Sequence, residues 1–179
     1  MGTKTAPSYA NIVMGKVENT IINNAENKPD NWMRYIDDIR FYWKHGEIRL
    51  KQFHEYCNTV HPTLKFTIDY NSDSIPFLDT TMLKDERKIE TTIYTKPTDK
   101  HSYLWSTSCH PSHVFRSIPW SQSLRYRRIC STTDKFNQAS LSLQNHLKKR
   151  GYKEETIKSA IQGAREMDRS IFFNNRNTS

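Results

Sequence analysis

The sequence predicts an α+β fold made of two parts with different patterns. In residues 1–98, one helical pattern is followed by short runs of alternating apolar and polar residues, which are typical of antiparallel strands. From about Pro97 onward the pattern is helical, so residues 99–170 are expected to form a small all-helical module. Residues 171–179 are expected to be a loose tail. The chain holds only 5 glycines and 7 prolines, which excludes a fibrous or low-complexity protein.

The first part begins with a helix and a hairpin. Residues 8–23 place apolar side chains at helical spacing, and Ser8 is the expected N-cap. Residues 32–43, WMRYIDDIRFYW, contain two aromatic and β-branched runs around a pair of aspartates. Such runs are typical of strands, so the segment predicts a hairpin with Asp37 and Asp38 at its tip.

A second helix and three strands are expected next. Residues 47–59 predict an amphipathic helix with Ile48, Phe53 and Tyr56 or Cys57 on its apolar side. LKFTIDY at 64–70 alternates cleanly, IPFLDTTML at 75–83 is a longer apolar run, and KIETTIYTKP at 88–97 alternates again. The three segments therefore predict three strands.

The second part predicts three helices. Residues 110–130 are basic and aromatic, and a break is expected at Pro119 because the residue before a proline is pushed out of helical geometry. Ser131 and Asp134 fit a capping box that opens the next helix, and Gly151 ends it. The apolar face of that helix is Phe136, Ala139, Leu143 and Leu147, and that of the last helix, residues 153–167, is Ile157, Ala160, Ile161, Ala164 and Met167. Two helices joined by a glycine turn form a helix-turn-helix-like unit.

The excess positive charge lies entirely in the second part. Residues 1–98 contain 13 Lys and Arg and 13 Asp and Glu, whereas residues 99–179 contain 14 and 6, which accounts for the net charge of +8. A basic surface of this kind is expected where a protein meets a polyanion such as DNA or RNA. A lysine-rich solvated face explains the charge as well, so charge permits nucleic-acid binding without establishing it.

The cysteines indicate a reducing compartment. Cys57, Cys109 and Cys130 are widely spaced and odd in number, which is not a disulfide framework. The sequence has no apolar run of membrane-spanning length and no signal peptide, so we expect an intracellular protein, nuclear or cytoplasmic and not secreted, with no membrane partner. Cys109 lies close to His110 and His113, but this spacing fits no common zinc finger, and packing around a proline turn is the better interpretation.

The residues Tyr35-Ile36-Asp37-Asp38 carry the strongest chemical signal. Nucleotidyl transfer needs carboxylates that hold two divalent metal ions a few ångströms apart. Adjacent aspartates at a hairpin tip offer the hard oxygen ligands that Mg²⁺ prefers. Taken alone, a double aspartate in a turn is usually only a turn.

Further segments extend this signal to a family. MGTKTAPSYAN precedes the YIDD hairpin by one helix and a loop, and the order and spacing of the two resemble the palm of reverse transcriptases. The later segments are HPTLKFT, IPFLDTTM, YTKPTDKHSYL, SCHPSH and SIPWSQSLRYRRICS. In this order they resemble the reverse transcriptases of Penelope-like retroelements, a class of retrotransposon, and the resemblance runs from Gly2 to about Gly151.

The resemblance implies an RNA-directed DNA polymerase that works on an RNA/DNA template-primer. Residues 1–98 would be part of its palm, and residues 99–170 its thumb or an attached helix-turn-helix module. Asp37 would ligate the catalytic Mg²⁺, or Mn²⁺ in its place, and Asp38 would support it. The residues expected to face the nucleotide or template are Gly2, Ala6, Pro7, Asn11 and Tyr35.

Arginines interleaved with aromatic residues follow residue 99 and are expected to bind nucleic acid. Such sets contact phosphates and stack on bases. The alternative is a helix with a charged outer face and buried aromatics, which can hold for Trp120 and Tyr126. The residues predicted to contact phosphates are Arg116, Arg125, Arg127, Arg128, Lys148, Lys149 and Arg150.

No polymerase activity is expected from this chain alone. The family carries another metal-binding aspartate on a strand before the MGTKTAPSYAN-like segment, and nothing precedes that segment here. The fingers, and the arginine and lysine that hold the triphosphate, are missing in the same way, and so is the C-terminal GIY-YIG nuclease of many Penelope-like proteins. The metal site would therefore be incomplete. Two alternatives stay open: a non-catalytic nucleic-acid-binding helix-turn-helix protein, and a truncated gene model without independent function.

Overall fold

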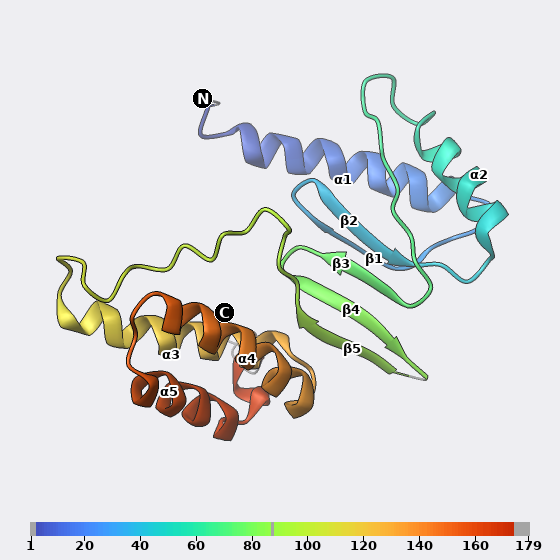
Figure 1. Cartoon of the computed structure of the whole chain (residues 1–179). Helices are drawn as coiled ribbons and strands as arrows, with labels where there is room; N and C mark the ends of the chain where they lie inside the picture. The colour runs from blue at the N-terminus through green and yellow to red at the C-terminus, as the bar shows by residue number, and fades with distance from the viewer. Residues whose placement is uncertain (1–2, 87, 174–179) are drawn as a thin grey trace. The chain divides into compact units, whose positions relative to one another are not determined.

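The computed structural model describes residues 3–86 and 88–173 and has an α+β fold, as predicted (Figure 1). The chain packs as two compact units, Met1–Tyr70 and Asn71–Ser179. This division falls after Tyr70, whereas the sequence pattern changes at residue 98. The domain boundary at residue 98 stays a prediction. Among the described residues, no helix is long and apolar enough to cross a membrane.

The first unit consists of two helices and a hairpin. Its elements are α1 (Ala6–Asn24), β1 (Asp30–Tyr35), β2 (Asp38–Tyr42) and α2 (Glu47–Cys57). The prediction that Ser8 caps α1 is wrong, because the helix begins at Ala6 with Thr5 as its N-cap. Pro7 lies in the first turn, where its missing N–H removes no helical hydrogen bond.

Aromatic side chains fill the core of the first unit. Trp32 and Phe41 stack from the two strands of the hairpin with ring centroids 5.4 Å apart, and Trp43 lies 5.1 Å from Phe53 of α2. Val17, Ile21, Ala25 and Cys57 are buried in the same cluster. Ile48 is 77% exposed, so the prediction that it belongs to the apolar side of α2 is wrong.

The predicted strand at 64–70 does not form. A strand needs a neighbour to satisfy its backbone groups, and Asn58 takes that role at Phe66. The Asn58 Oδ1 accepts from the Phe66 N–H at 2.7 Å, and its Nδ2 donates to the Phe66 carbonyl at 3.1 Å. The alternation of LKFTIDY instead places Leu64 and Phe66 against the aromatic core.

The second unit joins a three-stranded sheet to three helices. Its elements are β3 (Ser74–Phe77), β4 (Thr80–Asp85), β5 (Lys88–Ile93), α3 (Ser112–Ile129), α4 (Thr133–Lys149), α5 (Glu154–Glu166) and the short 3-10 helix η1 (Arg169–Phe172). The sheet is antiparallel in the order β3-β4-β5. The run IPFLDTTML is two strands and not the predicted one, because Leu78, with φ 56°, and Asp79 form a tight turn within it.

The helix α3 is continuous through Pro119, so the predicted break there is wrong. The Pro119 ring is fully buried, and its carbonyl accepts from the buried Ser123 hydroxyl at 2.7 Å. Next to it in the chain, Trp120 lies so close to Gly163 of α5 that a Cβ on this glycine would come within 2.8 Å of the indole ring. The packing of α3 against α5 therefore keeps the segment helical although proline cannot donate a helical hydrogen bond.

The helix α4 begins one residue later than predicted. Thr132 and not Ser131 is its N-cap, and the Thr132 hydroxyl accepts from the Lys135 N–H at 3.3 Å. The predicted core faces of α4 and α5 are confirmed at Phe136, Leu143, Leu147, Ile157 and Ala164, which are fully buried. Met167 does not belong to the face of α5, because the helix ends at Glu166 and Met167 is its half-buried C-cap.

The end of α3 is bound to β5. The Thr91 carbonyl accepts from the Ser131 N–H at 3.0 Å, and the Thr91 N–H donates to the Ser131 hydroxyl at 2.9 Å. The Thr91 hydroxyl in turn donates to the Ile129 carbonyl at 2.6 Å. These three bonds satisfy the backbone groups of the corner between α3 and α4 and fasten it to the sheet.

The predicted loose tail overlaps the described residues only in part. Ile171 and Phe172 belong to η1, in which Asp168 caps the Ser170 N–H at 2.9 Å. Residues 174–179 lie outside the described residues.

Candidate nucleic-acid interface

The connection between α4 and α5 is a tight glycine turn. The Tyr152 N–H donates to the Leu147 carbonyl at 3.2 Å, and the Gly151 N–H donates to the Lys148 carbonyl at 2.9 Å. This pair of bonds defines a Schellman motif, which requires a left-handed residue, and Gly151 has φ +81°. The predicted stop at Gly151 is confirmed. Two helices joined by such a short turn, with α3 packed on both, form a helix-turn-helix arrangement.

The loop that precedes α3 crosses this turn with Trp105 and Ser106, and this segment is called the strap below. The Ser106 N–H donates to the Arg150 carbonyl at 3.0 Å, and a Cβ at Gly151 would lie 2.6 Å from the Ser106 hydroxyl oxygen. The Arg150 guanidinium lies over the Trp105 ring, 4.8 Å from its centroid. The turn is therefore held by its neighbours, and its conformation is fixed by these interactions as well as by glycine.

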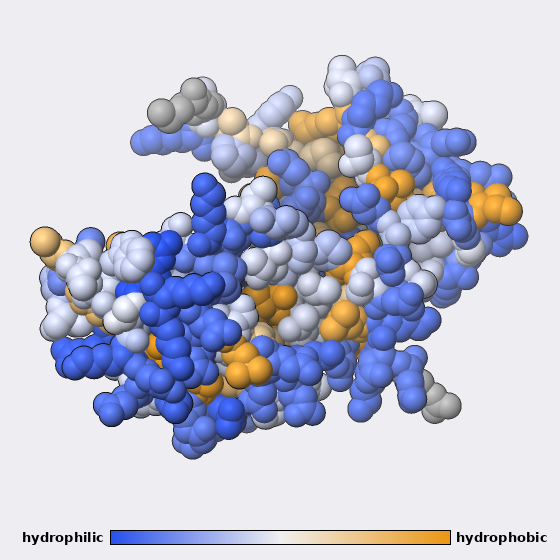
Figure 2. Space-filling view, viewed as in Figure 1, coloured by the Kyte–Doolittle hydropathy of each residue, from blue (hydrophilic) through white to orange (hydrophobic). Residues whose placement is uncertain are grey.

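The outer face of α5 carries a row of polar side chains. The side chains at every third or fourth position are exposed, whereas the opposite face is buried in the core. The exposed residues are Glu154, Glu155, Lys158, Ser159, Gln162, Arg165 and Glu166. The visible face of α3, α4 and α5 is mostly hydrophilic, with small hydrophobic patches (Figure 2).

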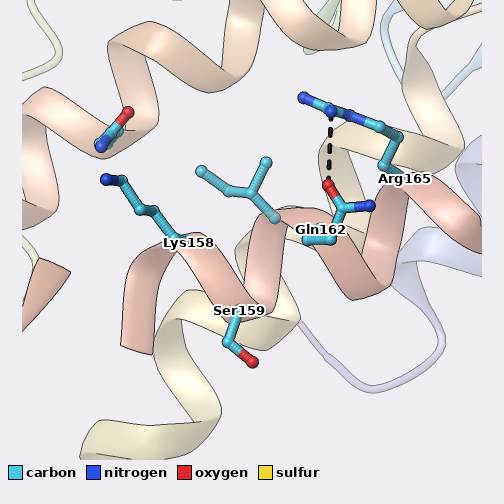
Figure 3. A pocket seen from close by; sticks show the side chains of 6 residues that line it. Lys158, Ser159, Gln162 and Arg165 are labelled. Carbon is cyan, nitrogen blue, oxygen red and sulfur yellow. Dashed lines mark hydrogen bonds between the residues drawn. The ribbon is translucent and has the colours of Figure 1, made fainter. Parts of the chain in front are cut away.

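A shallow groove runs along this row. Lys158, Ser159, Gln162 and Arg165 line it from α5 (Figure 3). Ile161 of the same helix and Gln144 of α4 complete the lining. The Arg165 Nη1 donates to the Gln162 Oε1 at 3.3 Å, and the Gln162 Nε2 donates to the Glu166 Oε1 at 2.6 Å. A guanidinium and an amide thus lie side by side on an exposed helix face.

One of the two glutamates in the first turn of α5 is paired with lysines. Glu154 pairs with Lys158 at 2.9 Å and with Lys148 of α4 at 3.1 Å. The hydrogen bonds from Lys158 and then from Lys148 lower the pKa of the Glu154 carboxyl. With two ammonium groups around one carboxylate, this cluster keeps a net positive charge.

The predicted phosphate-contacting residues lie in different surroundings. Arg116, Arg128 and Lys149 are exposed. Arg125 pairs with Asp79 of the sheet turn at 2.8 Å, and Lys148 pairs with Glu154.

Two further members of the predicted set have structural roles. The half-buried Arg127 donates to the Met167 carbonyl at 3.2 Å and lies over the Phe136 ring, whereas Arg150 lies over Trp105. Of the two aromatics with alternative interpretations, Tyr126 is buried in the core and Trp120 is 40% exposed.

The groove residues on α5 were missed by the sequence reasoning. Apolar spacing predicts the helix and its buried face, but it assigns no role to the polar positions. The signal was present, because Lys158, Gln162 and Arg165 recur at helical spacing and must share a face.

The hairpin of the first unit forms as predicted. Asp38 pairs with Tyr35 to close the turn, and Asp37 lies within it beside Ile36, which has φ 53°. Both aspartates are exposed. The Arg34 Nη1 donates to the Ile36 carbonyl at 3.2 Å, so a side chain of β1 fixes the turn.

Arg34 also ties the hairpin to α1. Its Nε donates to the Glu18 carboxylate at 2.9 Å, and its Nη1 donates to the Asn11 Oδ1 at 2.9 Å. Glu18 accepts in addition from the Trp32 indole N–H at 3.0 Å. Of the residues expected to face nucleotide or template, Asn11 is therefore one side chain away from the aspartate turn.

The other residues of that set are less informative. Tyr35 is 58% exposed at the end of β1, and Ala6 and Pro7 lie exposed in the first turn of α1. Gly2 lies outside the described residues. Within residues 3–86 and 88–173, no group of three or more acidic, histidine or cysteine side chains could hold a metal ion. Asp37 and Asp38 alone do not complete a two-metal site.

Comparison with known proteins supports the helix-turn-helix class. A family model described as "Animal helix-turn-helix domain" matches residues 102–162, about a third of the chain. The matched segment runs from the strap through α3 and α4 to Gln162 of α5. No curated protein matches the chain, and no solved structure does.

Proposed function

We propose that the second unit is a non-catalytic nucleic-acid-binding module. The observation that carries the proposal is the match of residues 102–162 to a helix-turn-helix family, on a structure in which α4, the glycine turn and α5 have that arrangement. The exposed basic residues support it, since phosphate neutralisation by Lys and Arg supplies most of the affinity of such modules. The exposed members of the predicted set are Arg116, Arg125, Arg128, Lys148 and Lys149, of which Arg125 and Lys148 are held in ion pairs.

Charge reversal tests the proposal. The variant Arg116→Glu, Arg128→Glu, Lys149→Glu is expected to weaken binding to a fluorescent random-sequence duplex by on the order of ten-fold or more. The slope of log affinity against log salt should become shallower by about 0.9 for each phosphate that the variant no longer neutralises. The measurement is fluorescence anisotropy of the whole chain over a salt series.

A matched control separates the module from net charge. Lys16, Lys28 and Arg49 are exposed in the first unit, and reversing all three to Glu changes the net charge by the same amount. The control should retain most of the affinity and slope. Equal reductions in both triple variants would mean that total charge, and no particular surface, binds the duplex.

A second candidate function rests on the hairpin. We infer that the first unit derives from the palm of an RNA-directed DNA polymerase of the Penelope-like class. The supporting observation is that the YIDD turn lies between two paired strands and is tied by Arg34 to α1, the helix that precedes it. The resemblance rests on the same order, a MGTKTAPSYAN-like segment followed by the YIDD hairpin. In a retrotransposon polymerase, the nucleic acid bound by the basic module would be the template-primer.

Primer extension tests this second candidate. On a primed RNA template with Mg²⁺ or Mn²⁺, we expect no extension by the chain or by its Asp37→Ala, Asp38→Ala variant, because two adjacent carboxylates do not complete the site. Extension that depends on both aspartates would refute the expected inactivity and would mean that another chain supplies the missing carboxylate. Extension that persists in the variant would point to a contaminating polymerase.

A further inference from the structure

The strap presents an exposed aromatic ring beside the turn between α4 and α5. Resting on the proposed nucleic-acid-binding function, we propose that Trp105, backed by Arg150, is a stacking platform for an unpaired base of a nucleic acid. The ligand class is a single strand, or a duplex that ends in a single-stranded tail. Trp105 lies outside the predicted phosphate-contacting set, so this site is distinct from the exposed arginines and lysines.

One face of the Trp105 ring is covered and the rest is open. The Arg150 guanidinium lies over the ring, 4.8 Å from its centroid. Trp105 is nevertheless 55% exposed, which is more than a ring covered on both faces could be. A cation over one face of an indole is attracted by its π-electrons. The opposite face is therefore left for a further planar group.

The backbone around Trp105 is held on both sides of the ring. The Ser108 N–H donates to the Trp105 carbonyl at 3.0 Å, and the Ser106 N–H donates to the Arg150 carbonyl at 3.0 Å. A Cβ at Gly151 would lie 2.6 Å from the Ser106 hydroxyl oxygen, so the strap and the turn are in close contact. A ring fixed in this way has little freedom to lose on binding, which favours affinity.

The turn beside the ring is basic. Residues 146–153 contain four Lys and Arg and no Asp or Glu. Glu154 and Glu155 follow at the start of α5, and Glu154 is paired with Lys148 at 3.1 Å and with Lys158 at 2.9 Å. Two carboxylates against the four basic side chains of the turn leave an excess of positive charge. A single exposed apolar side chain needs no ligand to explain it, but a fixed ring beside cations fits a ligand that combines planar groups with phosphates.

An unpaired base suits this ring better than the side of a duplex does. Within a duplex both faces of a base are covered by its neighbours, whereas an unpaired base can offer a face to an aromatic side chain. Every base has such a face, so stacking of this kind tolerates any sequence. Single-stranded DNA and single-stranded RNA share this chemistry.

A tail of defined chemistry tests the inference on the unmodified chain. Fluorescence anisotropy compares a blunt duplex with the same duplex carrying a single-stranded tail of about six nucleotides. The tail should raise the affinity by on the order of ten-fold. A tail of abasic nucleotides keeps the phosphates and removes the base faces, so it should lack most of this advantage. Tails of DNA and of RNA are both measured, and an advantage from either supports the inference and identifies the source of the base.

Substitutions assign the effect to the ring. Trp105→Leu should remove most of the advantage of the base-bearing tail, while the affinity for the blunt duplex changes little. Trp105→Tyr keeps an aromatic face and should keep most of the advantage. Trp120→Leu, which removes an indole that is 40% exposed on α3, is the matched control and should leave the advantage unchanged. The thermal unfolding midpoint verifies the fold of each variant.

Three outcomes would overturn the inference and spare the proposed function. The first is equal affinity for the abasic and the base-bearing tail. The second is an advantage of the base-bearing tail that persists in folded Trp105→Leu. The third is an equal reduction of both affinities in Trp105→Leu with a lowered unfolding midpoint, which would give Trp105 a purely structural role. Failure of the unmodified chain to bind any of these nucleic acids would instead refute the proposed function itself.

Discussion

The two compact units contain different kinds of candidate site. Residues 1–70 contain 9 Lys and Arg and 8 Asp and Glu, and their candidate site is a pair of carboxylates in a turn. Residues 71–179 contain 18 and 11, and their candidate site is the face of a helix. Turn carboxylates need further ligands to hold a metal ion, whereas a rigid helix face can bind a partner with the residues it already has. The difference explains why the second unit supports the stronger functional argument.

The hydrophobic cores of the two units also differ in composition. The first unit packs a few aromatic rings between a hairpin and α2, and the second packs aliphatic and aromatic side chains of three helices and a sheet. Substitutions that act on one core and spare the other therefore test whether the units are energetically separate.

The largest expected effect is a cavity at Phe136. Phe136 is fully buried among the helices, so Phe136→Ala should lower the free energy of unfolding of the second unit by about 3–5 kcal/mol. Duplex binding should disappear with it. Hydrogen exchange followed by mass spectrometry should show reduced protection after residue 70 and unchanged protection before it. Leu141→Ala, at a 63% exposed position of the same helix, is the control. An equal reduction of protection in both units would contradict their independence.

Three glycines should respond with different signs. Gly151→Ala strains a left-handed position and also brings a Cβ within 2.6 Å of Ser106, so we expect the second unit to be destabilised by about 1–2 kcal/mol. Gly46→Ala has open space around it, but φ 83° with ψ 163° is a combination almost confined to glycine, so it should also destabilise the first unit, by about 1–3 kcal/mol. Gly15→Ala, inside α1 with nothing within 4 Å, should stabilise the first unit by about 0.5–1 kcal/mol. Denaturant unfolding measures all three, and a stabilised Gly151 variant would refute the account of the turn.

The smallest expected effect concerns one exposed ion pair in each unit. Glu47 with Lys51 and Glu154 with Lys158 have the same spacing at the start of a helix. Hydrogen bonding from Lys51, and then from Tyr70, lowers the pKa of Glu47, as Lys158 and Lys148 lower that of Glu154. Because both folded-state pKa values are depressed, each pair stabilises its unit fully above the ordinary value of 4.5, and the contribution is lost as the pH falls through the lowered value.

The matching measurement is thermal unfolding between about pH 7 and pH 3. Glu154→Gln should flatten the acid-side fall in stability of the second unit, and Glu47→Gln that of the first. A change in both units from either variant would contradict the separation. An unchanged profile in both would mean that solvent screens these pairs completely.

Local sequence patterns predicted the hairpin and the helix faces because those patterns fix which side chains meet. The spacing of Leu143 and Leu147 leaves one buried face for α4, and the aspartates between two aromatic runs leave one place for a turn. The errors arose where tertiary interactions override local preference. Asn58 satisfied the backbone of a segment expected to be a strand, and packing against α5 carried α3 through Pro119.

The candidate site was predictable in its charge and less so in its geometry. Exposed Arg116, Arg128 and Lys149 fit the predicted phosphate set, although Arg127 has partners in the core that no spacing rule reveals. The groove on α5 follows from helical periodicity once its buried face is known. The hydrogen bonds of Gln162 with Arg165 and Glu166 depend on side-chain rotamers, which helical spacing does not determine.

The bonds between Thr91 and the corner of α3 and α4 bear on how this module can be excised or transferred. A fragment cut where the helical sequence begins, near residue 99, would leave the Ser131 N–H and the Ile129 carbonyl without their partners on β5. The smallest autonomous piece is therefore expected to begin near Asn71 and to carry its three strands along. A fragment with the three helices alone, whether made by recombination or by cloning, would expose backbone groups that β5 satisfies in the whole unit.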